Sequence, residues 1–251
     1  GLITALGDTR MEAITTNNLG AIASERGDFE RAERLLTRTL ELQRQLNSQR
    51  DLPFTLINLG EAVRGLGDIT LAHDYLAEAV QLLREAGNPA IEGHALHGLG
   101  AVALDRGELA EAAAMVLEST RMVADAGDRH TIVDNAELLA EIAIAHGSHR
   151  AAAELAGAAA ALRELLQAAP NPVAAERLAR VERELAKALD AETLAAQRAE
   201  GARAAPVFPT LRALRSARRR APPSRPVRGR ARAHPAGSRS ANGARAVAAA
   251  Y

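Results

Sequence analysis

The sequence contains no cysteine and no tryptophan, and aromatic residues make up only 2% of its 251 residues. Without cysteine the chain has no disulfides, no thiolate metal ligands and no cysteine nucleophile. Its apolar runs are shorter than the roughly 18 residues of a membrane span, and its first residues lack the basic and apolar regions of a signal peptide. We therefore expect a cytoplasmic protein with no membrane partner.

Hydrophobic residues make up 47% of the chain, and most of them are alanine and leucine. Both residues are strong helix formers. The length is sufficient for a substantial buried core. This composition predicts an all-α fold.

Charge divides the chain into two parts near residue 200. Residues 1–200 hold all 31 acidic residues and 19 of the 31 basic ones, so this part carries −12 and the remainder +12. The remainder is rich in Arg, Pro, Ala, Gly and Ser, and we expect residues 202–251 to be a disordered tail. Its 12 arginines could bind nucleic acid non-specifically. Alternatively, the tail is a frame-shifted sequence, because GC-rich codons read out of frame give the same composition.

A 40-residue repeat organises the chain up to residue 168. The dipeptide Leu-Gly recurs at residues 19–20, 59–60 and 99–100, and Leu139-Ala140 keeps the same step. Eight residues after each of these leucines comes a second marker, at Gly27, Gly67, Gly107 and Gly147. Several markers that share one period are typical of a solenoid, in which each unit presents the same positions to its neighbours.

Within each repeat, apolar positions follow helical spacing on both sides of the second glycine, which predicts two antiparallel helices joined by a tight turn. Residues 11–168 thus form four helix pairs. Their first helices are expected near 11–25, 51–65, 90–105 and 131–145, and their second helices near 29–46, 69–86, 109–126 and 149–168.

The two ends of the array are interpreted separately. We expect residues 1–10 to be the remnant of a preceding repeat that ends at Gly7, and hence the chain to be part of a longer array. Residues 169–201 are expected to form two capping helices, with Asn171 and Asp190 as N-caps and Gly201 as the end.

The glycines of the repeat have two predicted roles. Gly60 and Gly100 lie inside first helices, where glycine costs about 1 kcal/mol relative to alanine, so we expect them at close helix contacts. Gly27 and Gly67 lie at helix ends, where glycine adopts the left-handed conformation without steric cost.

This combination of markers resembles the tetratricopeptide repeat. The first helix contains Leu-Gly, the turn contains Gly-Asp followed by an apolar residue, and an alanine comes four residues after the aspartate, as Ala32 follows Asp28. The period of 40 exceeds the usual 34, and Leu56 and Leu96 stand where the family has aromatic residues. The resemblance implies a right-handed superhelical solenoid of antiparallel helix pairs. It also implies that the first helices line a groove that binds a protein, a peptide or a small ligand.

Long-period arrays of this kind resemble the C-terminal sensor regions of LuxR-type bacterial transcriptional regulators, including the maltose-regulon activator, and of related signalling ATPases. Residues 151–201 are similar to the closing segment of those regulators. The resemblance implies a sensor or scaffold within a larger regulator, whose ligand could be a small-molecule inducer. Nothing after Gly201 has the apolar pattern of a helix-turn-helix module, so DNA binding through such a module is not expected.

The groove positions that the resemblance assigns differ from repeat to repeat, whereas the Leu-Gly positions do not. Candidate binding residues are Phe54, Glu61, Arg64, His94, His97, Asp134, Glu137 and Glu141. The last three would give the groove an acidic floor, which favours a basic partner. Two alternatives remain open: the side chains are merely solvated, or the array serves self-association.

Three patterns that could indicate chemistry have structural explanations. Residues 98–103 fit G-x-G-x-x-A, but no strand precedes them. His94 and His97 could share a metal on one helix face, whereas His146 and His149 lie on opposite sides of a turn. Serine, histidine and aspartate occur without a nucleophile motif such as G-x-S-x-G. We predict a protein that is not an enzyme and that needs no metal or cofactor.

Overall fold

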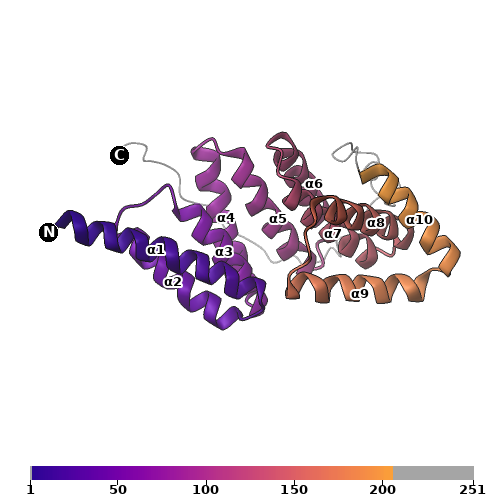
Figure 1. Cartoon of the computed structure of the whole chain (residues 1–251), viewed down its shortest axis with the longest axis horizontal. Coiled ribbons are helices and arrows are strands. Elements are labelled where there is room, and N and C mark those ends of the chain that lie inside the picture. The colour runs from indigo at the N-terminus through magenta and orange to yellow at the C-terminus, as the bar shows by residue number, and fades with distance from the viewer. Residues whose placement is uncertain (1, 206–251) are drawn as a thin grey trace, which may run out of the picture. The chain divides into compact units, whose positions relative to one another are not determined.

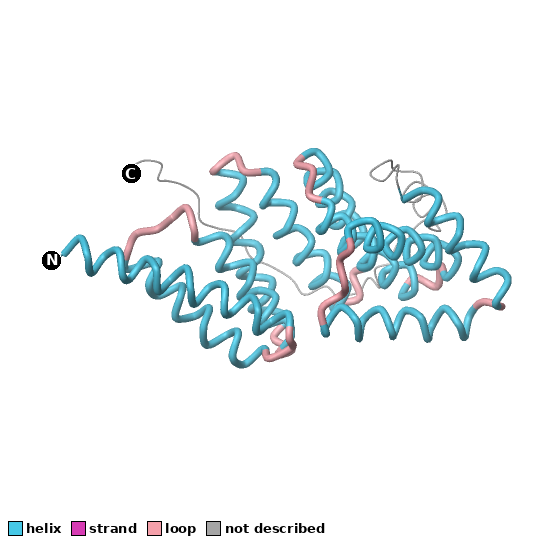
Figure 2. The backbone as a smooth tube through the Cα atoms, in the orientation of Figure 1, coloured by secondary structure: helices cyan, strands magenta, loops and turns pink. Residues whose placement is uncertain are grey.

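The computed structural model describes residues 2–205, which form ten α-helices and no strand. The helices belong to one compact unit, Gly1–Arg220. Figure 1 shows the helices in chain order, and Figure 2 shows the short loops that join them. None of these ten helices is long and apolar enough to cross a membrane. Their bounds are α1 (Leu2–Glu25), α2 (Phe29–Gln45), α3 (Leu52–Gly65), α4 (Ile69–Glu85), α5 (Pro89–Asp105), α6 (Leu109–Asp125), α7 (Arg129–Ala145), α8 (His149–Leu166), α9 (Pro172–Ala188) and α10 (Ala191–Ala204).

The first eight helices form four antiparallel pairs that stack in chain order (Figure 1). α1 packs against α2, α3 against α4, α5 against α6, and α7 against α8. Each second helix also packs against the first helix of the next pair, and successive first helices contact each other. α9 continues the row of first helices, because it packs against α7 as α7 packs against α5. The described fold is therefore an all-α solenoid of helix pairs, as the repeat predicts.

A glycine turn separates the two helices of each pair. Gly67 has a φ of +89°, in the left-handed region that glycine adopts freely. This conformation lets the Asp68 N–H donate to the Val63 carbonyl (3.0 Å), which satisfies the end of α3. The Asp68 carboxylate then accepts from the Leu71 N–H (3.0 Å) and caps α4. The predicted turn is confirmed, and the same conformation recurs at Gly27, Gly107 and Gly147.

The glycines inside the first helices mark close contacts with the second helices. A Cβ on Gly60 would lie 2.6 Å from Leu76 Cγ, and one on Gly100 would lie 2.5 Å from Val116 Cγ2. Leu76 and Val116 are fully buried, so neither can move aside without leaving a gap. The predicted helix contacts are confirmed, and they explain why a residue of low helix propensity recurs at this position.

The N-terminal expectation is wrong in one respect. We expected residues 1–10 to end a preceding second helix at Gly7, but α1 is one continuous helix from Leu2 to Glu25. An internal glycine costs only about 1 kcal/mol, whereas a break would require a new helix to be nucleated. Gly7 therefore lies within α1, which also contains the first helix expected from residue 11.

The C-terminal boundary also needs correction. The Asn171 carboxamide oxygen accepts from the Ala174 N–H (2.8 Å) and Asp190 caps α10 in the same way, as predicted. However, α10 continues to Ala204, so residues 202–204 are helical and do not belong to the tail. Gly201 does not end the helix because it is a packing residue: a Cβ there would overlap the Glu154 carbonyl of α8. Residues 206–251 of the expected tail, with 11 of its 12 arginines, lie outside the described residues.

The last two helices do not form a fifth pair. α10 packs closely against α8, whereas its contact with α9 is slight. The contact relies on a second glycine, Gly157 of α8, where a Cβ would overlap the backbone of Arg198. α10 therefore covers the last second helix of the array, and α9 covers the last first helix.

Candidate functional site

The candidate binding residues lie along the row of first helices. Together with one residue each from α1 and α9 they form a surface that we call the first-helix face, made of Asn17, Phe54, Glu61, Arg64, His94, His97, Asp134, Glu137, Glu141 and Arg177. Polar side chains on it join successive helices. Asn17 Oδ1 accepts from Thr55 Oγ1 of α3 (3.1 Å), and Arg64 of α3 donates to Asp105 of α5 (2.6 Å).

Glu61 has a raised pKa on this face. Desolvation, followed by the negative charge of Asp134, raises the pKa of Glu61 to about 6 against the opposing effect of Arg64 and Arg177. These residues belong to α3, α7 and α9, although α5 lies between α3 and α7 in the stack. Glu61 keeps exposed surface, so it is accessible to water while protein surrounds it. Within residues 2–205 its carboxylate forms no hydrogen bond or ion pair.

His97 is held as a neutral side chain. Burial lowers its pKa to about 4, and Arg177 and Arg64 act in the same direction, although the hydrogen bond to Asn135 opposes them. Its Nδ1 lies 2.7 Å from Asn135 Oδ1, which can only accept, so the proton is on Nδ1. Asn135 in turn donates to Ser119 Oγ (2.9 Å), which donates to the Gly93 carbonyl (2.6 Å). This chain of hydrogen bonds fixes the imidazole and leaves Nε2 as an acceptor.

His94 has a different environment, although it is only one helical turn away. Its Nε2 lies 2.9 Å from Asp128 Oδ2 and 3.4 Å from Thr131 Oγ1, at the start of α7. The two histidines that could have shared a metal thus contact different partners. The described residues contain no cluster of three or more potential metal ligands.

The three carboxylates of the expected acidic floor are paired with two arginines. Glu137 is buried, and Arg163 of α8 binds it with two hydrogen bonds, from Nε to Oε1 (2.5 Å) and from Nη2 to Oε2 (2.9 Å). Arg163 Nη2 also lies 3.3 Å from Asp134 Oδ1. Arg177 Nε lies 3.1 Å from Glu141 Oε1, an ion pair without hydrogen-bond geometry. A buried carboxylate requires such a partner, since an isolated charge is costly to desolvate.

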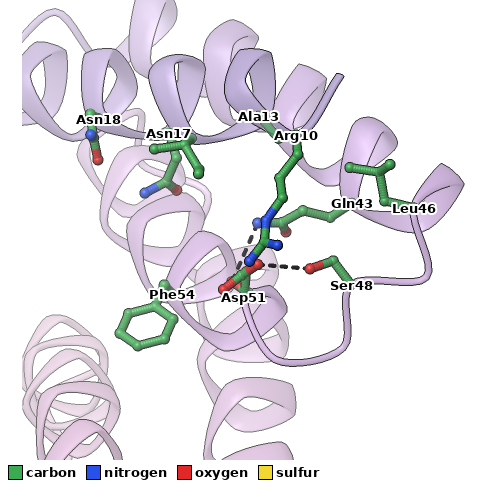
Figure 3. Close-up of a pocket in the computed structure, with 10 residues that line it drawn as sticks. Arg10, Ala13, Asn17, Asn18, Gln43, Leu46, Ser48, Asp51 and Phe54 are labelled. Carbon is green, nitrogen blue, oxygen red and sulfur yellow. Dashed lines mark hydrogen bonds between the residues drawn. The ribbon is translucent and has the colours of Figure 1, made fainter. Parts of the chain in front are cut away.

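A pocket lies at the α1 end of the first-helix face (Figure 3). Its volume is about 150 Å³. Ile14 and Phe54 line it, with 46% and 41% of their surfaces exposed. Gln43 lines it and is buried, and its Oε1 has no hydrogen-bond partner among the described residues. The lining consists of Arg10, Ala13, Ile14, Asn17, Asn18, Gln43, Leu46, Ser48, Asp51 and Phe54.

Asp51 organises the polar side of this pocket. Its carboxylate accepts from Ser48 Oγ (2.7 Å), and its backbone carbonyl accepts from Gln43 Nε2 (3.4 Å), as the dashed lines in Figure 3 show. Arg10 extends from α1 toward these groups in the same view. Apolar and polar surfaces therefore meet at one place, which is the usual composition of a binding pocket.

A comparison with protein families supports the repeat. The tetratricopeptide repeat model matches residues 11–85. These residues are therefore similar to tetratricopeptide repeats, over less than half of the chain. A solved structure from Podosopora anserina, titled as a putative kinesin light chain with nearly identical TPR-like repeats, is similar with a TM-score of 0.51 and 18% sequence identity. The similarity covers 78% of this chain and 96% of that chain. The comparison with curated proteins gave no match.

The described residues therefore adopt a TPR-like solenoid, and the likeness to the solved structure concerns the fold alone. The tetratricopeptide repeat family model matches the first two helix pairs, which include the pocket at Phe54. Neither comparison concerns LuxR-type regulators, so that part of the resemblance stays a hypothesis.

Sequence reasoning missed two arginines that pair with carboxylates of the first-helix face, Arg163 and Arg177. Arg177 could have been found, because it lies 40 residues after Glu137, which itself lies 40 residues after His97. Arg163 lies on a second helix, where the repeat gives no indication that its side chain reaches the groove. The polar side of the pocket, at Gln43 and Asp51, also gave no signal, since it depends on the path of the loop after α2.

Proposed function

We propose that this chain is a non-catalytic scaffold that binds a segment of a partner protein along the first-helix face. The observation that carries the proposal is the pocket at Ile14 and Phe54. Two large apolar side chains remain exposed there, beside a buried acceptor without a partner. Tetratricopeptide repeats generally mediate protein–protein interactions, which supports the same conclusion.

The pocket suits one anchor side chain of the partner. Its volume of about 150 Å³ is similar to that of an engineered apolar cavity that holds one benzene ring. Ile14 and Phe54 supply apolar contact. Once the Gln43 side chain turns toward the pocket, its Oε1 can accept a hydrogen bond from a donor at the tip of the anchor. Binding energy at protein interfaces is concentrated in such anchors.

Glu61 supplies a second point of recognition. The arginines of the face already pair with Asp105, Asp134, Glu137 and Glu141, whereas Glu61 has no partner in the described structure. A cationic side chain of the partner would offset the proximity of Glu61 to Asp134, and would lower the pKa of Glu61 toward its usual value. A segment with an apolar anchor and a basic residue therefore fits the face.

The wider role that we infer is the sensor part of a bacterial transcriptional or signalling regulator in the cytoplasm. It is supported by the 40-residue period and by the resemblance of residues 151–201 to the closing segment of LuxR-type regulators. A small-molecule inducer at the same pocket is the alternative ligand. Binding of nucleic acid through residues 202–251 is a further alternative, which would not depend on Phe54.

A peptide library displayed on phage tests the proposal directly. We expect the selected peptides to share an apolar or aromatic anchor and a nearby basic residue. Phe54→Ala should weaken their binding by about tenfold or more, as for an interface anchor. Glu61→Gln should remove the preference for the basic residue. Leu165→Ala is the matched control, because Leu165 is an exposed leucine on α8, outside the first-helix face.

Two results would contradict the proposal. One is a library that yields no binder of the folded chain. The other is a set of peptides whose binding is unchanged in Phe54→Ala and Ile14→Ala but lost when second-helix residues such as Arg38 or Glu78 are replaced. The second result would assign binding to the opposite face of the array.

A further inference from the structure

The outer side of α1 is an uncovered helix-packing surface. Leu19 is 42% exposed, whereas its counterparts in the repeat, Leu59, Leu99 and Leu139, are 0%, 7% and 5% exposed. Ile22 is 44% exposed, although Ala62, Val102 and Ile142 at the same position are buried. Met11 is exposed as well. The same side of the helix is therefore part of the core in the later repeats and faces solvent in α1.

In the later repeats a second helix covers this side. α2 packs against α3, α4 against α5 and α6 against α7. Two contacts locate the covered side: Asn135 of α7 donates to Ser119 of α6, and Gly98 of α5 lies against Leu76 of α4. Asn135 corresponds to Thr15 in α1, which is exposed. The uncovered side of α1 is thus complementary to another helix, because its equivalents are packed against one.

Six exposed residues form this surface, which we call the α1 free face: Asp8, Met11, Thr15, Leu19, Ile22 and Arg26. Their spacing of three or four residues places the first five on one side of α1, and Arg26 directly follows its last residue, Glu25. This side is distinct from the first-helix face, to which α1 contributes Asn17, and from the side that packs on α2 with Ala13 and Ala23.

The two ends of the α1 free face carry opposite charges. Asp8 and Arg26 are 18 residues apart, or about 27 Å along the helix. Both side chains are exposed, and neither has a hydrogen bond or ion pair within the described part of the chain. If two such helices pair antiparallel about a two-fold axis, Asp8 of each lies opposite Arg26 of the other. Parallel pairing would instead bring like charges together.

We propose that two copies of this chain associate through their α1 free faces, in antiparallel orientation. Thr15 and Leu19 lie at the centre, Met11 and Ile22 on either side of it, and the two Asp8–Arg26 ion pairs at the ends. Such an interface is isologous and closes after two copies. Head-to-tail addition has no matching surface in the described array, because α10 already packs against α8, the last second helix. The proposal does not depend on the proposed function.

Sedimentation velocity of the full chain, from low micromolar to several hundred micromolar, is the first test. We expect the mass to rise from 26.4 kDa to twice that value. Ile22→Glu should leave the chain monomeric throughout, because it buries one carboxylate on each side of the centre of the interface, where apolar side chains would otherwise meet. Leu165→Glu is the matched control, since Leu165 is an exposed leucine on α8, and this variant should dimerise like the parent chain. Unchanged thermal melts show that both variants fold.

Charge exchange tests the antiparallel orientation. Asp8→Arg and Arg26→Asp should each weaken dimerisation roughly tenfold, because each converts two attractions into two repulsions. An equimolar mixture of the two variants should restore association, since each variant supplies the charges that the other lacks. The double variant with both changes should also dimerise, and all these effects should diminish at high salt.

Three results would overturn the proposal. The first is a chain that stays monomeric over the whole concentration range, which would leave the α1 free face to a preceding helix of a longer chain. The second is a dimer that Ile22→Glu does not affect. The third is a mixture of the two charge variants that associates no better than either alone, which would exclude the antiparallel pairing.

Discussion

Arg163 of α8 and the buried carboxylate of Glu137 of α7 form a two-point hydrogen-bonded ion pair, with donor–acceptor distances of 2.5 and 2.9 Å. The pair joins the two helices of the last repeat at the first-helix face. It also changes the expected character of that face, because a row of carboxylates becomes a row of ion pairs. The repeat determines where Glu137 lies, whereas its partner depends on how α8 packs.

Removing the arginine alone should therefore be costly. Arg163→Met leaves the Glu137 carboxylate buried without a counter-charge, and we expect the free energy of unfolding to fall by roughly 3–5 kcal/mol. The double variant with Glu137→Leu should be more stable than Arg163→Met alone, since no buried charge remains. Urea denaturation of both variants measures the difference. A single variant as stable as the parent would show that Glu137 is solvated.

The close contact at Gly60 gives a second prediction. Gly60→Leu should lower the free energy of unfolding by about 1–3 kcal/mol, because the new side chain overlaps Leu76 and forces α3 and α4 apart. Leucine at the exposed position Glu78 of α4 is the control, and it should change stability by no more than about 0.5 kcal/mol. An unchanged denaturant midpoint for Gly60→Leu would contradict the helix contact.

Glu61 should make stability depend on pH in an unusual direction for a carboxylate. Its pKa rises from 4.5 to about 6 in the folded chain, so the folded state binds the proton more tightly than the unfolded state. The resulting stability is fully present below pH 4.5 and is lost as the pH rises through about 6. We expect the difference in unfolding free energy between the parent and Glu61→Gln to decrease over this interval. Nuclear magnetic resonance of the Glu61 carboxyl carbon gives the pKa itself.

His97 should have the opposite effect. Its pKa falls from 6.5 to about 4, so the folded state binds the proton less tightly than the unfolded state. The stability due to His97 is present above pH 6.5 and is lost as the pH falls toward about 4. The imidazole C–H resonances of His97 should remain unchanged down to about pH 5, whereas those of an exposed histidine titrate near its usual value. Titration of His97 at its usual pKa would mean that its imidazole is not buried in solution.

The repeat, the helix boundaries at the turns and both glycine roles could be predicted because they depend on local chemistry. Gly67 ends α3 through its own backbone conformation, and Asp68 caps the helix that follows. Gly60 was recognisable because a stacked array imposes the same contact every 40 residues. The resemblance to the tetratricopeptide repeat, applied in the same register, predicted Phe54 and Glu61 on the first-helix face.

Features that break the regularity could not be predicted. A glycine signals a helix end only when no tertiary contact uses it, and Gly201 packs against α8 instead. Gly7 signals no end either, because nothing there favours a break in α1 over its continuation.

The sequence by itself therefore determined an all-α array of helix pairs, its register and its turns, because these follow from backbone conformation and from a period that every repeat obeys. Tertiary structure alone decided which charges meet on the first-helix face, how α10 closes the array against α8, and which side of α1 remains uncovered. Each of these depends on side chains from elements that the period does not relate, so their partners become known only when the helices are packed.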